Sequence, residues 1–316
     1  MNVRDYRTED REGLEALVAT VPDETVRAHA RFGHVQKPPL QTRTVVAAPE
    51  PGSPPVGFAS FYQNQLHYHP HDFRVSVVVA PVWQRRGVGR ALHSALLERL
   101  PHPVVRLRTL IPETAGESAF LTSLSYRPLL RSFSPELAVG EVESDTYRAA
   151  LSALAKSGYH LTSLASLNKA VNLNKAELHD RLVELCLEAY ADIHTYSPPT
   201  GDLDMWKDIF LEDCRDEAFF VAMKNGEPVG FSSLQAGESA RELESMWDGV
   251  ARSERALAYP VRLALKLCEV EYARTQDVET LIWEVDSVDL VGMQLMNTLP
   301  FKVPPAYEMW ALDITT

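Results

Sequence analysis

The stretch VSVVVAPVWQRRGVGRALH, from Val75 to His93, is the segment of the sequence that indicates the fold most clearly. It opens on a run of β-branched residues, which is typical of a buried strand. Pro81 ends that strand, because proline has no N–H to donate to a neighbouring strand. Residues Arg90–Leu100 then place their apolar side chains at helical spacing. The stretch therefore predicts a buried strand, a turn and a helix, in that order.

The turn between strand and helix contains Gln84-Arg85-Arg86-Gly87-Val88-Gly89. Gly87 and Gly89 allow the backbone to approach a ligand closely and to take a positive φ. The free N–H groups of the first helical turn, together with the positive end of the helix dipole, favour a diphosphate. The arginines at 85, 86 and 90 add positive charge. The turn predicts a phosphate-binding site, with a solvated helix-start loop as the alternative.

Two common phosphate-binding loops do not fit this turn. A Rossmann loop has GxGxxG and an acidic residue at the end of the next strand, but only Gly-Val-Gly is present and Val104–Leu110 ends without an acid. A Walker loop would need GK[ST], which is absent here. The pattern V-x-P-x-x-Q-x-x-G-x-G, which spans Val79–Gly89, resembles the pyrophosphate-binding motif of the GNAT family of N-acetyltransferases.

This resemblance implies an α/β (α+β) fold, with a mixed, mostly antiparallel sheet flanked by helices, and acetyl-CoA as the co-substrate. It implies that Val77 and Val79 offer backbone groups to the pantetheine arm, in a gap where two strands splay. It also implies that the amides of Arg85–Arg90 hold the diphosphate. The coenzyme-binding set is then Val77, Val78, Val79, Gln84, Arg85, Arg86, Gly87, Val88, Gly89 and Arg90.

The sequence also repeats itself. Pro55–Ser60 (PVGFAS) recurs as Pro228–Ser233 (PVGFSS), and strand-like, Arg-rich and Ala/Leu-rich segments follow in the same order in each half. Matched order and spacing predict a duplication. We expect two tandem domains of this fold, residues 1–140 and 157–316, joined by Gly140–Lys156.

The second half departs from the coenzyme-binding pattern. Asp248–Arg255 resembles the approach to the loop, but Ala256-Leu257-Ala258-Tyr259-Pro260 stands where R-G-x-G should follow. No glycine remains, Pro260 removes an amide, and each Cβ obstructs close approach of a diphosphate. We expect that this half kept the fold and lost tight coenzyme binding.

Acetyl transfer to an amine requires the amine to be neutral and the leaving thiolate to gain a proton. His71 and Asp72 lie nearest the expected reaction centre, and histidine titrates near neutrality. Counting along the second half places Glu244 where many family members keep a general base, although Glu242 and Glu244 could equally be two acids on an exposed strand face. In the family a tyrosine often serves as the acid, and Leu121 occupies that position here.

Two further polar features have ordinary explanations. His67, His69 and His71 would share one face of an extended segment, which is compatible with a metal site or with an exposed polar hairpin. Without a fixed acidic ligand we expect no metal there. Tyr126 replaces a core phenylalanine of the family, and we expect it to be packed.

Composition narrows the class of protein. The chain has 316 residues, 45% of them hydrophobic, and a formal net charge of −12, which disfavours a nucleic-acid partner. Three scattered cysteines favour a reducing compartment, and the charged N-terminus shows no signal peptide. We expect a cytoplasmic acetyl-CoA-dependent N-acetyltransferase, acting by direct transfer on a small-molecule or peptide amine without a membrane partner. A non-catalytic protein that binds acyl-CoA or a metabolite, or recruits a partner, is the alternative.

Overall fold

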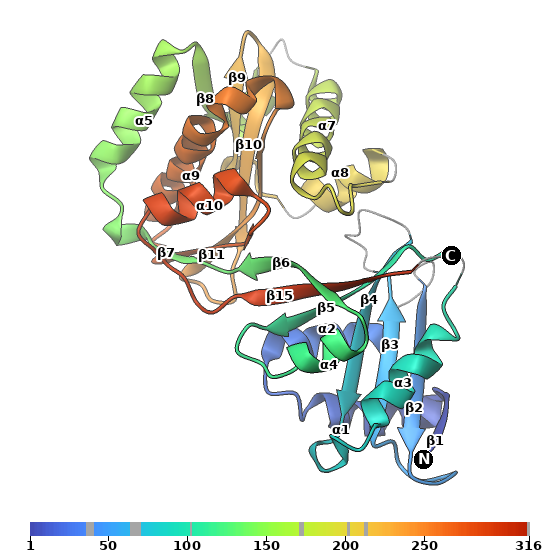
Figure 1. The fold of residues 1–316 in the computed structure, drawn as a ribbon. Coiled ribbons are helices and arrows are strands. Elements are labelled where there is room, and N and C mark those ends of the chain that lie inside the picture. Colours follow the sequence, from blue (N-terminus) through green and yellow to red (C-terminus); the bar gives the residue numbers. More distant parts are fainter. Residues whose placement is uncertain are drawn as a thin grey trace. The chain divides into compact units, whose positions relative to one another are not determined.

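The computed structural model describes residues 1–35, 41–63, 71–101, 103–170, 174–200, 203–211 and 214–314, the side chains of 32–35 excepted. The predicted histidines His67 and His69 lie outside this set. The chain forms two compact units: residues 1–130 with 307–316, called here the first unit, and residues 131–306, the second unit (Figure 1). No helix in the described ranges is long and apolar enough to cross a membrane.

The first unit is built on a mixed sheet whose strands follow the order β1-β2-β3-β4-β5-β15-β6. The pairs β1–β2, β2–β3, β3–β4 and β5–β15 are antiparallel, whereas β4 and β5 are parallel, as predicted for a mixed, mostly antiparallel sheet. The strands are β1 (Asn2–Asp5), β2 (Thr42–Ala48), β3 (Gly57–Tyr62), β4 (Asp72–Val79), β5 (Arg106–Pro112), β6 (Arg127–Phe133) and β15 (Tyr307–Asp313).

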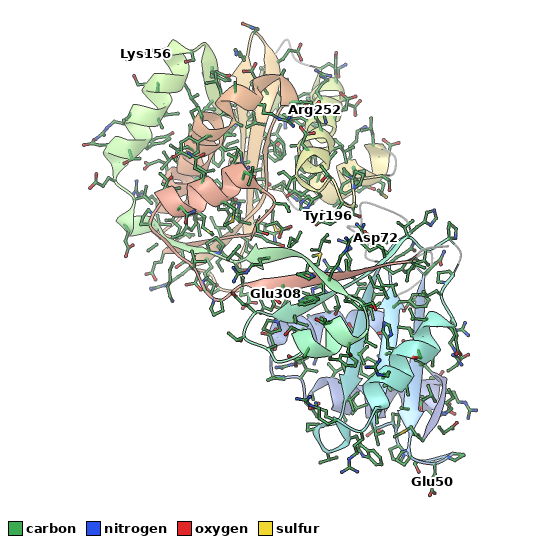
Figure 2. All side chains as sticks on the ribbon, in the orientation of Figure 1. Glu50, Asp72, Lys156, Tyr196, Arg252 and Glu308 are labelled. Carbon is green, nitrogen blue, oxygen red and sulfur yellow. The ribbon has the colours of Figure 1, made fainter. Side chains whose placement is uncertain are left out.

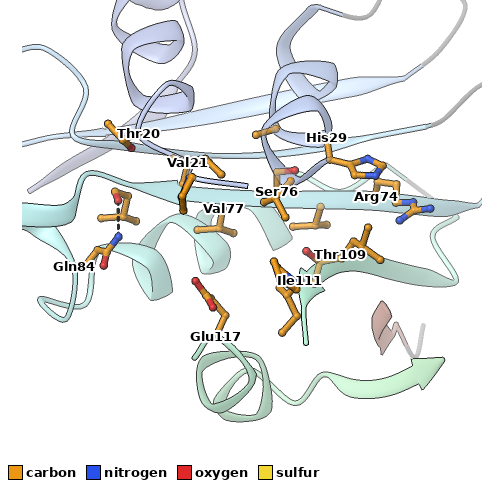
Figure 3. A pocket seen from close by; sticks show the side chains of 18 of the residues that line it. Thr20, Val21, His29, Arg74, Ser76, Val77, Gln84, Thr109, Ile111 and Glu117 are labelled. Carbon is orange, nitrogen blue, oxygen red and sulfur yellow. Dashed lines mark hydrogen bonds between the residues drawn. The ribbon is translucent and has the colours of Figure 1, made fainter. Parts of the chain in front are cut away.

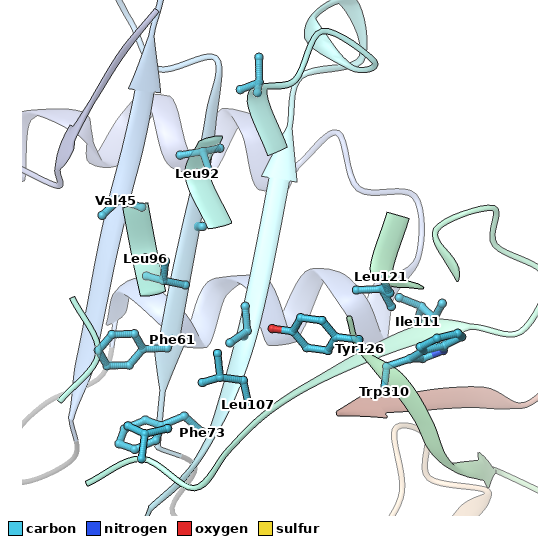
Figure 4. Packing of buried hydrophobic residues seen from close by; sticks show 14 of the residues in the cluster. Val45, Phe61, Phe73, Leu92, Leu96, Leu107, Ile111, Leu121, Tyr126 and Trp310 are labelled. Carbon is cyan, nitrogen blue, oxygen red and sulfur yellow. The ribbon is translucent and has the colours of Figure 1, made fainter. Parts of the chain in front are cut away.

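Helices cover both faces of this sheet, because successive strand residues point to opposite sides. On β4, Val75 packs in the core beneath α3 (Val88–Leu97) and α4 (Ser118–Ser123), and Figure 4 shows part of this cluster. Val78 packs in the opposite core, beneath α1 (Arg11–Val18) and α2 (Glu24–Val35). β4 is therefore buried from both sides, which explains its run of apolar β-branched residues.

The second unit repeats this plan, with the strand order β8-β9-β10-β11-β12-β7-β14. The strands are β7 (Glu136–Ala138), β8 (Tyr159–Ser163), β9 (Phe219–Lys224), β10 (Glu227–Ala236), β11 (Glu242–Val250), β12 (Thr280–Trp283), β14 (Phe301–Lys302) and β13 (Val285–Asp286), which pairs with the end of β6. The helices are α5 (Ser144–Lys156), α6 (Leu164–Lys169), α7 (Lys175–Ile193), α8 (Leu203–Leu211), α9 (Ala258–Thr275) and α10 (Leu290–Thr298).

The predicted elements are largely present, with shifted ends. Asn225 and Gly226 take φ values of 53° and 88°, so the β9–β10 hairpin has the two-residue turn that the sequence predicts. Helix α2 was not predicted, because charged and polar residues interrupt the apolar ones along its sequence, ETVRAHARFGHV. The predicted connection Gly140–Lys156 is mostly helix α5, which belongs to the second unit.

The two repeats exchange one strand. The C-terminal strand β15 pairs with β5 and so completes the sheet of the first unit, whereas β7, which precedes the second repeat in sequence, pairs with β12 in the second unit. The compact units therefore differ from the predicted division at 1–140 and 157–316. A strand can pair with any free sheet edge that its backbone N–H and C=O groups reach. The local sequence of β7 or β15 therefore does not determine whether it pairs with its own repeat or with the other one.

We predict that Trp310→Ala destabilises the first unit by about 3–5 kcal/mol, because Trp310 is 7% exposed in its core and a cavity would remain. Urea unfolding followed by hydrogen exchange of β5 peptides measures this effect. Val82→Ala, at a side chain that is 72% exposed, is the control and should change stability by less than about 0.5 kcal/mol. Unchanged protection of β5 in Trp310→Ala would contradict the inclusion of β15 in this core.

Candidate active site

The parallel strands β4 and β5 pair over only three residues. Asp72, Phe73 and Arg74 of β4 lie opposite Arg106–Arg108 of β5. Beyond this point β4 continues to Val79 while remaining paired with β3 on its other edge, so the edge that faces β5 is left without a partner strand. The first unit therefore has the splayed strands that the GNAT resemblance implies.

A pocket of about 190 Å³ lies at this splay (Figure 3). Its walls come from α2, β3, β4, β5 and the turn before α3. It includes Val77, Val78, Val79 and Gln84 of the predicted coenzyme-binding set. The other lining residues include Thr20, Val21, Pro22, Val26, His29, Ala30, Tyr62, Arg74, Val75, Ser76, Pro81, Thr109, Leu110, Ile111, Pro112 and Glu117.

The turn beside the pocket has the geometry of an anion site. Gly87 is the N-cap of α3 with φ at 80°, a value that favours glycine. The first helical hydrogen bond runs from the Ala91 N–H to the Gly87 carbonyl at 3.0 Å, so the N–H groups of Val88, Gly89 and Arg90 have no acceptor inside the helix. A Cβ added at Gly89 would lie 3.2 Å from the Phe120 ring.

The side chains of the turn are held by local contacts. Gln84 Nε2 donates to the Val79 carbonyl at 3.1 Å, which links the turn to the end of β4. The Arg86 guanidinium lies over the Trp83 ring at 5.4 Å, and Arg90 donates to Ser123 Oγ at 3.0 Å. None of these contacts uses a carboxylate, so the positive charge of the turn remains available to an anion.

A histidine and a tyrosine meet on the α2 side of the pocket. His29 Nδ1 and the Tyr62 hydroxyl are hydrogen bonded at 2.9 Å. Burial, and then the charge of Arg74, lowers the pKa of His29 from 6.5 to about 4, so the imidazole is neutral at pH 7. Burial raises the pKa of Tyr62 to about 12. The sequence did not predict this pair, because helix α2, which carries His29, was not expected. Asp23 could have indicated the start of α2, since its side chain accepts from the Val26 N–H at 2.9 Å and aspartate is a common helix N-cap.

Two arginines stand opposite each other where the pairing of β4 with β5 ends. Arg108 is buried, and its Nε lies 3.2 Å from Oδ2 of Asp72, which is also buried. Arg74, its register partner on β4, lines the pocket. Asp72 was predicted to be catalytic, but its carboxylate is already paired with Arg108. This ion pair favours a role for Asp72 in positioning Arg108. His71, the other candidate of this segment, lies immediately before β4.

The second unit has a comparable splay, but charged side chains bridge it. β11 pairs with β12 only over Glu242–Ser245. Farther along, the buried Arg262 of α9 donates to Asp248 of β11 at 2.9 Å and to Asp289 beyond β12 at 2.7 Å. A buried network within the protein thus connects the diverging strands.

Acidic side chains also occupy the turn of the second unit. Asp192 of α7 accepts from Arg252 at 2.6 Å and from Arg255 at 2.7 Å, and Glu188 accepts from the Arg252 N–H at 2.5 Å (Figure 2 labels Arg252). A cavity of about 400 Å³ lies beside them, which is larger than the pocket of the first unit. Its charge is nevertheless unsuitable for a diphosphate, because Asp192 and Asp289 line it and already pair with its arginines.

The remaining candidates have protein partners. Glu244, on β11 of the second unit, accepts from Gln235 Nε2 at 2.8 Å. Leu121 is buried in the core of the first unit. Tyr126 is packed as predicted, with its hydroxyl 3.1 Å from His93 Nε2, and burial raises its pKa. Among the described residues no cluster of three His, Cys, Asp or Glu side chains is placed to hold a metal.

We predict that His29 stays neutral throughout pH 5.5–8. Its lowered pKa of about 4 means that protonation is disfavoured in the folded protein until the pH falls well below the ordinary value of 6.5. The test is an NMR titration of histidine ring carbons, with the His29 signal identified by its loss in His29→Gln. A midpoint near 6.5 for that signal would contradict the buried, neutral assignment.

Comparisons with known proteins agree with this geometry. Residues 6–115 match the model of the acetyltransferase (GNAT) family. A tandem GNAT protein from the clavulanic acid biosynthesis pathway has the same fold, with a TM-score of 0.57 and 18% identity over 100% of this chain and 99% of its own. A GCN5-related N-acetyltransferase from Sphaerobacter thermophilus gives a TM-score of 0.60 and 16% identity over 100% and 96%.

A GCN5-related glucosamine N-acetyltransferase region of a fungal multi-domain β-N-acetylglucosaminidase gives a TM-score of 0.67 and 16% identity, over 98% of this chain and 38% of its own. No curated protein matches the sequence. At these identities the solved structures establish the fold alone, and over the whole chain that fold is the one of a tandem GNAT protein. Residues 6–115 of the first unit also match the model of the GNAT acetyltransferase family.

Proposed function

We propose that the protein is an acetyl-CoA-dependent N-acetyltransferase that acetylates an amine of a small molecule or peptide, with the coenzyme bound in the first unit. The observation that carries this proposal is the difference between the two splays. In the first unit the gap opens on a pocket beside the α3 turn, where the arginines have no acidic partner among the described residues. In the second unit Asp192 pairs with Arg255 and Asp289 pairs with Arg262, so these positive charges are already balanced.

The pocket offers the groups that the coenzyme needs. The β5-facing edge of Val77–Val79 has backbone groups free to pair with the amides of a pantetheine arm. The N–H groups of Val88–Arg90, with the positive end of α3, suit a diphosphate. The residues present therefore fit acetyl-CoA, which supplies the activated acetyl group when bound.

The His29–Tyr62 pair is the best-placed group for proton transfer. The neutral imidazole can accept a proton from an incoming amine, either directly or through water, and the Tyr62 hydroxyl, with its raised pKa, is protonated and can donate. Direct transfer requires no covalent bond to the protein, which agrees with a pocket that has no cysteine in its lining.

Steady release of free thiol from acetyl-CoA in the presence of an amine panel tests the proposed function. We expect turnover with at least one amine and none without an amine. Tight coenzyme binding without turnover across the panel would contradict the enzyme proposal and support a coenzyme-binding protein.

We predict that Gly89→Pro weakens acetyl-CoA binding about ten- to a hundredfold, because it removes an N–H that would donate to a charged phosphate, while proline is tolerated in a first helical turn. Isothermal titration calorimetry measures the affinity. The control Arg255→Ala alters the turn of the second unit and should leave the affinity unchanged. The reverse pattern would assign the coenzyme to the second unit.

A further inference from the structure

Arg74 is a half-buried arginine whose charge is not balanced by any acid that the structure describes. Its Nε and Nη1 atoms are shielded from solvent and have no hydrogen-bond partner, and it makes no ion pair with any residue that the structure describes. A guanidinium stays charged at every physiological pH, so its nitrogens cannot be relieved by deprotonation. Buried charges without partners are costly, and native proteins rarely keep them.

Other deeply set arginines of this chain do have acids. Arg4 pairs with Asp10 at 2.7 Å, and Arg262 pairs with two aspartates. Directly opposite Arg74 on β5, Arg108 pairs with Asp72 at 3.2 Å. The chain has 43 acidic residues against 31 basic ones, so the exception at Arg74 does not reflect a shortage of carboxylates. The stretches 36–40 and 64–70, which lie outside the described residues, contain no Asp or Glu in their sequence.

Arg74 faces the pocket at the point where β4 and β5 separate. Figure 3 shows its guanidinium beside His29, at the opposite end of the pocket from Gln84 and the coenzyme turn. Glu117 is the one carboxylate among the described residues of the lining; it is the N-cap of α4 and forms no ion pair with Arg74. The His29–Tyr62 pair and an unbalanced positive charge therefore lie together, away from the phosphate-binding end.

We propose that Arg74 binds a carboxylate of the acceptor, so that the substrate is a small amine that also carries a carboxylate group. This inference rests on the proposed function, because it names the acceptor of the same site. A carboxylate would accept charge-assisted hydrogen bonds from Arg74 and would hold the amine of the same molecule near His29. Specificity follows because a plain amine leaves the shielded Nε and Nη1 atoms of Arg74 without an acceptor.

The test compares matched amines with wild-type protein, Arg74→Met and Arg74→Lys. Each pair consists of an amino acid and the amine that lacks its carboxylate, for example 4-aminobutanoate and butylamine, with 3-aminopropylphosphonate as a second anion. We expect the wild type to prefer the amino carboxylate, and Arg74→Met to lose kcat/KM for it about ten- to a hundredfold while the plain amine is unaffected. Arg74→Lys should restore part of the loss, because it keeps the charge.

Three controls distinguish a binding role from a structural one. Arg31→Met removes an exposed arginine of α2, whose guanidinium is 3.7 Å from Glu15, and should leave all rates unchanged. The affinity for acetyl-CoA should be the same in Arg74→Met as in the wild type. The Tm of Arg74→Met should be equal or higher, because the variant loses two shielded guanidinium nitrogens that have no hydrogen-bond partner among the described residues. A clear fall in Tm, or equal losses for both members of a pair, would overturn the proposal.

Failure of the inference and failure of the proposed function give different results. Turnover of plain amines with no preference for a carboxylate, or a preference for the phosphonate, rejects the carboxylate assignment and leaves the acetyltransferase proposal in place. If no amine is turned over, calorimetric titration of 4-aminobutanoate into the protein saturated with coenzyme A still tests Arg74. Binding that is lost in Arg74→Met supports the site, and absence of binding in the wild type overturns it.

Discussion

The parting of β4 from β5 after Arg74 and Arg108 is the constraint on which the rest of the first unit depends. A parallel pair that separates exposes backbone N–H and C=O groups on one strand edge, and those groups need partners. β4 can tolerate this because β3 holds its other edge and apolar cores cover both of its faces. The buried ion pair between Asp72 and Arg108 joins the first paired residue of β4 to the last paired residue of β5, so it ties the two strands together just before the gap.

The second unit shows what the same fold becomes when the gap has internal partners. Arg262 connects the two diverging strands through Asp248 and Asp289. Burial by itself would lower the pKa of Arg262, but the two aspartates outweigh it and raise that pKa further above the ordinary arginine value. Asp192 and Glu188 satisfy the arginine and amide donors of the turn. A diphosphate would meet carboxylates there, whereas in the first unit it meets N–H groups and arginines. Volume alone would favour the second cavity, so charge and donor supply decide the assignment.

Sequence alone predicted the elements whose pattern is local. The Val75–His93 stretch specified a strand, a turn and a helix, and the absence of glycine in Ala256–Pro260 marked the second turn as different. The exchange of β7 and β15 could not be predicted, because both repeats offer similar strand edges. His29 was missed because α2 has few apolar residues and gains its stability from packing on the sheet. Arg74 could not be found from the sequence, because its lack of a partner among the described residues is a property of the folded chain.

We propose that the first unit alone holds the coenzyme. A crystal structure of the protein grown with coenzyme A is the direct test. We predict one coenzyme per chain, with its diphosphate on the N–H groups of Val88–Arg90 and its pantetheine arm along the free edge of Val77–Val79. A diphosphate bound at Arg252–Arg255, with the first pocket empty, would contradict this assignment.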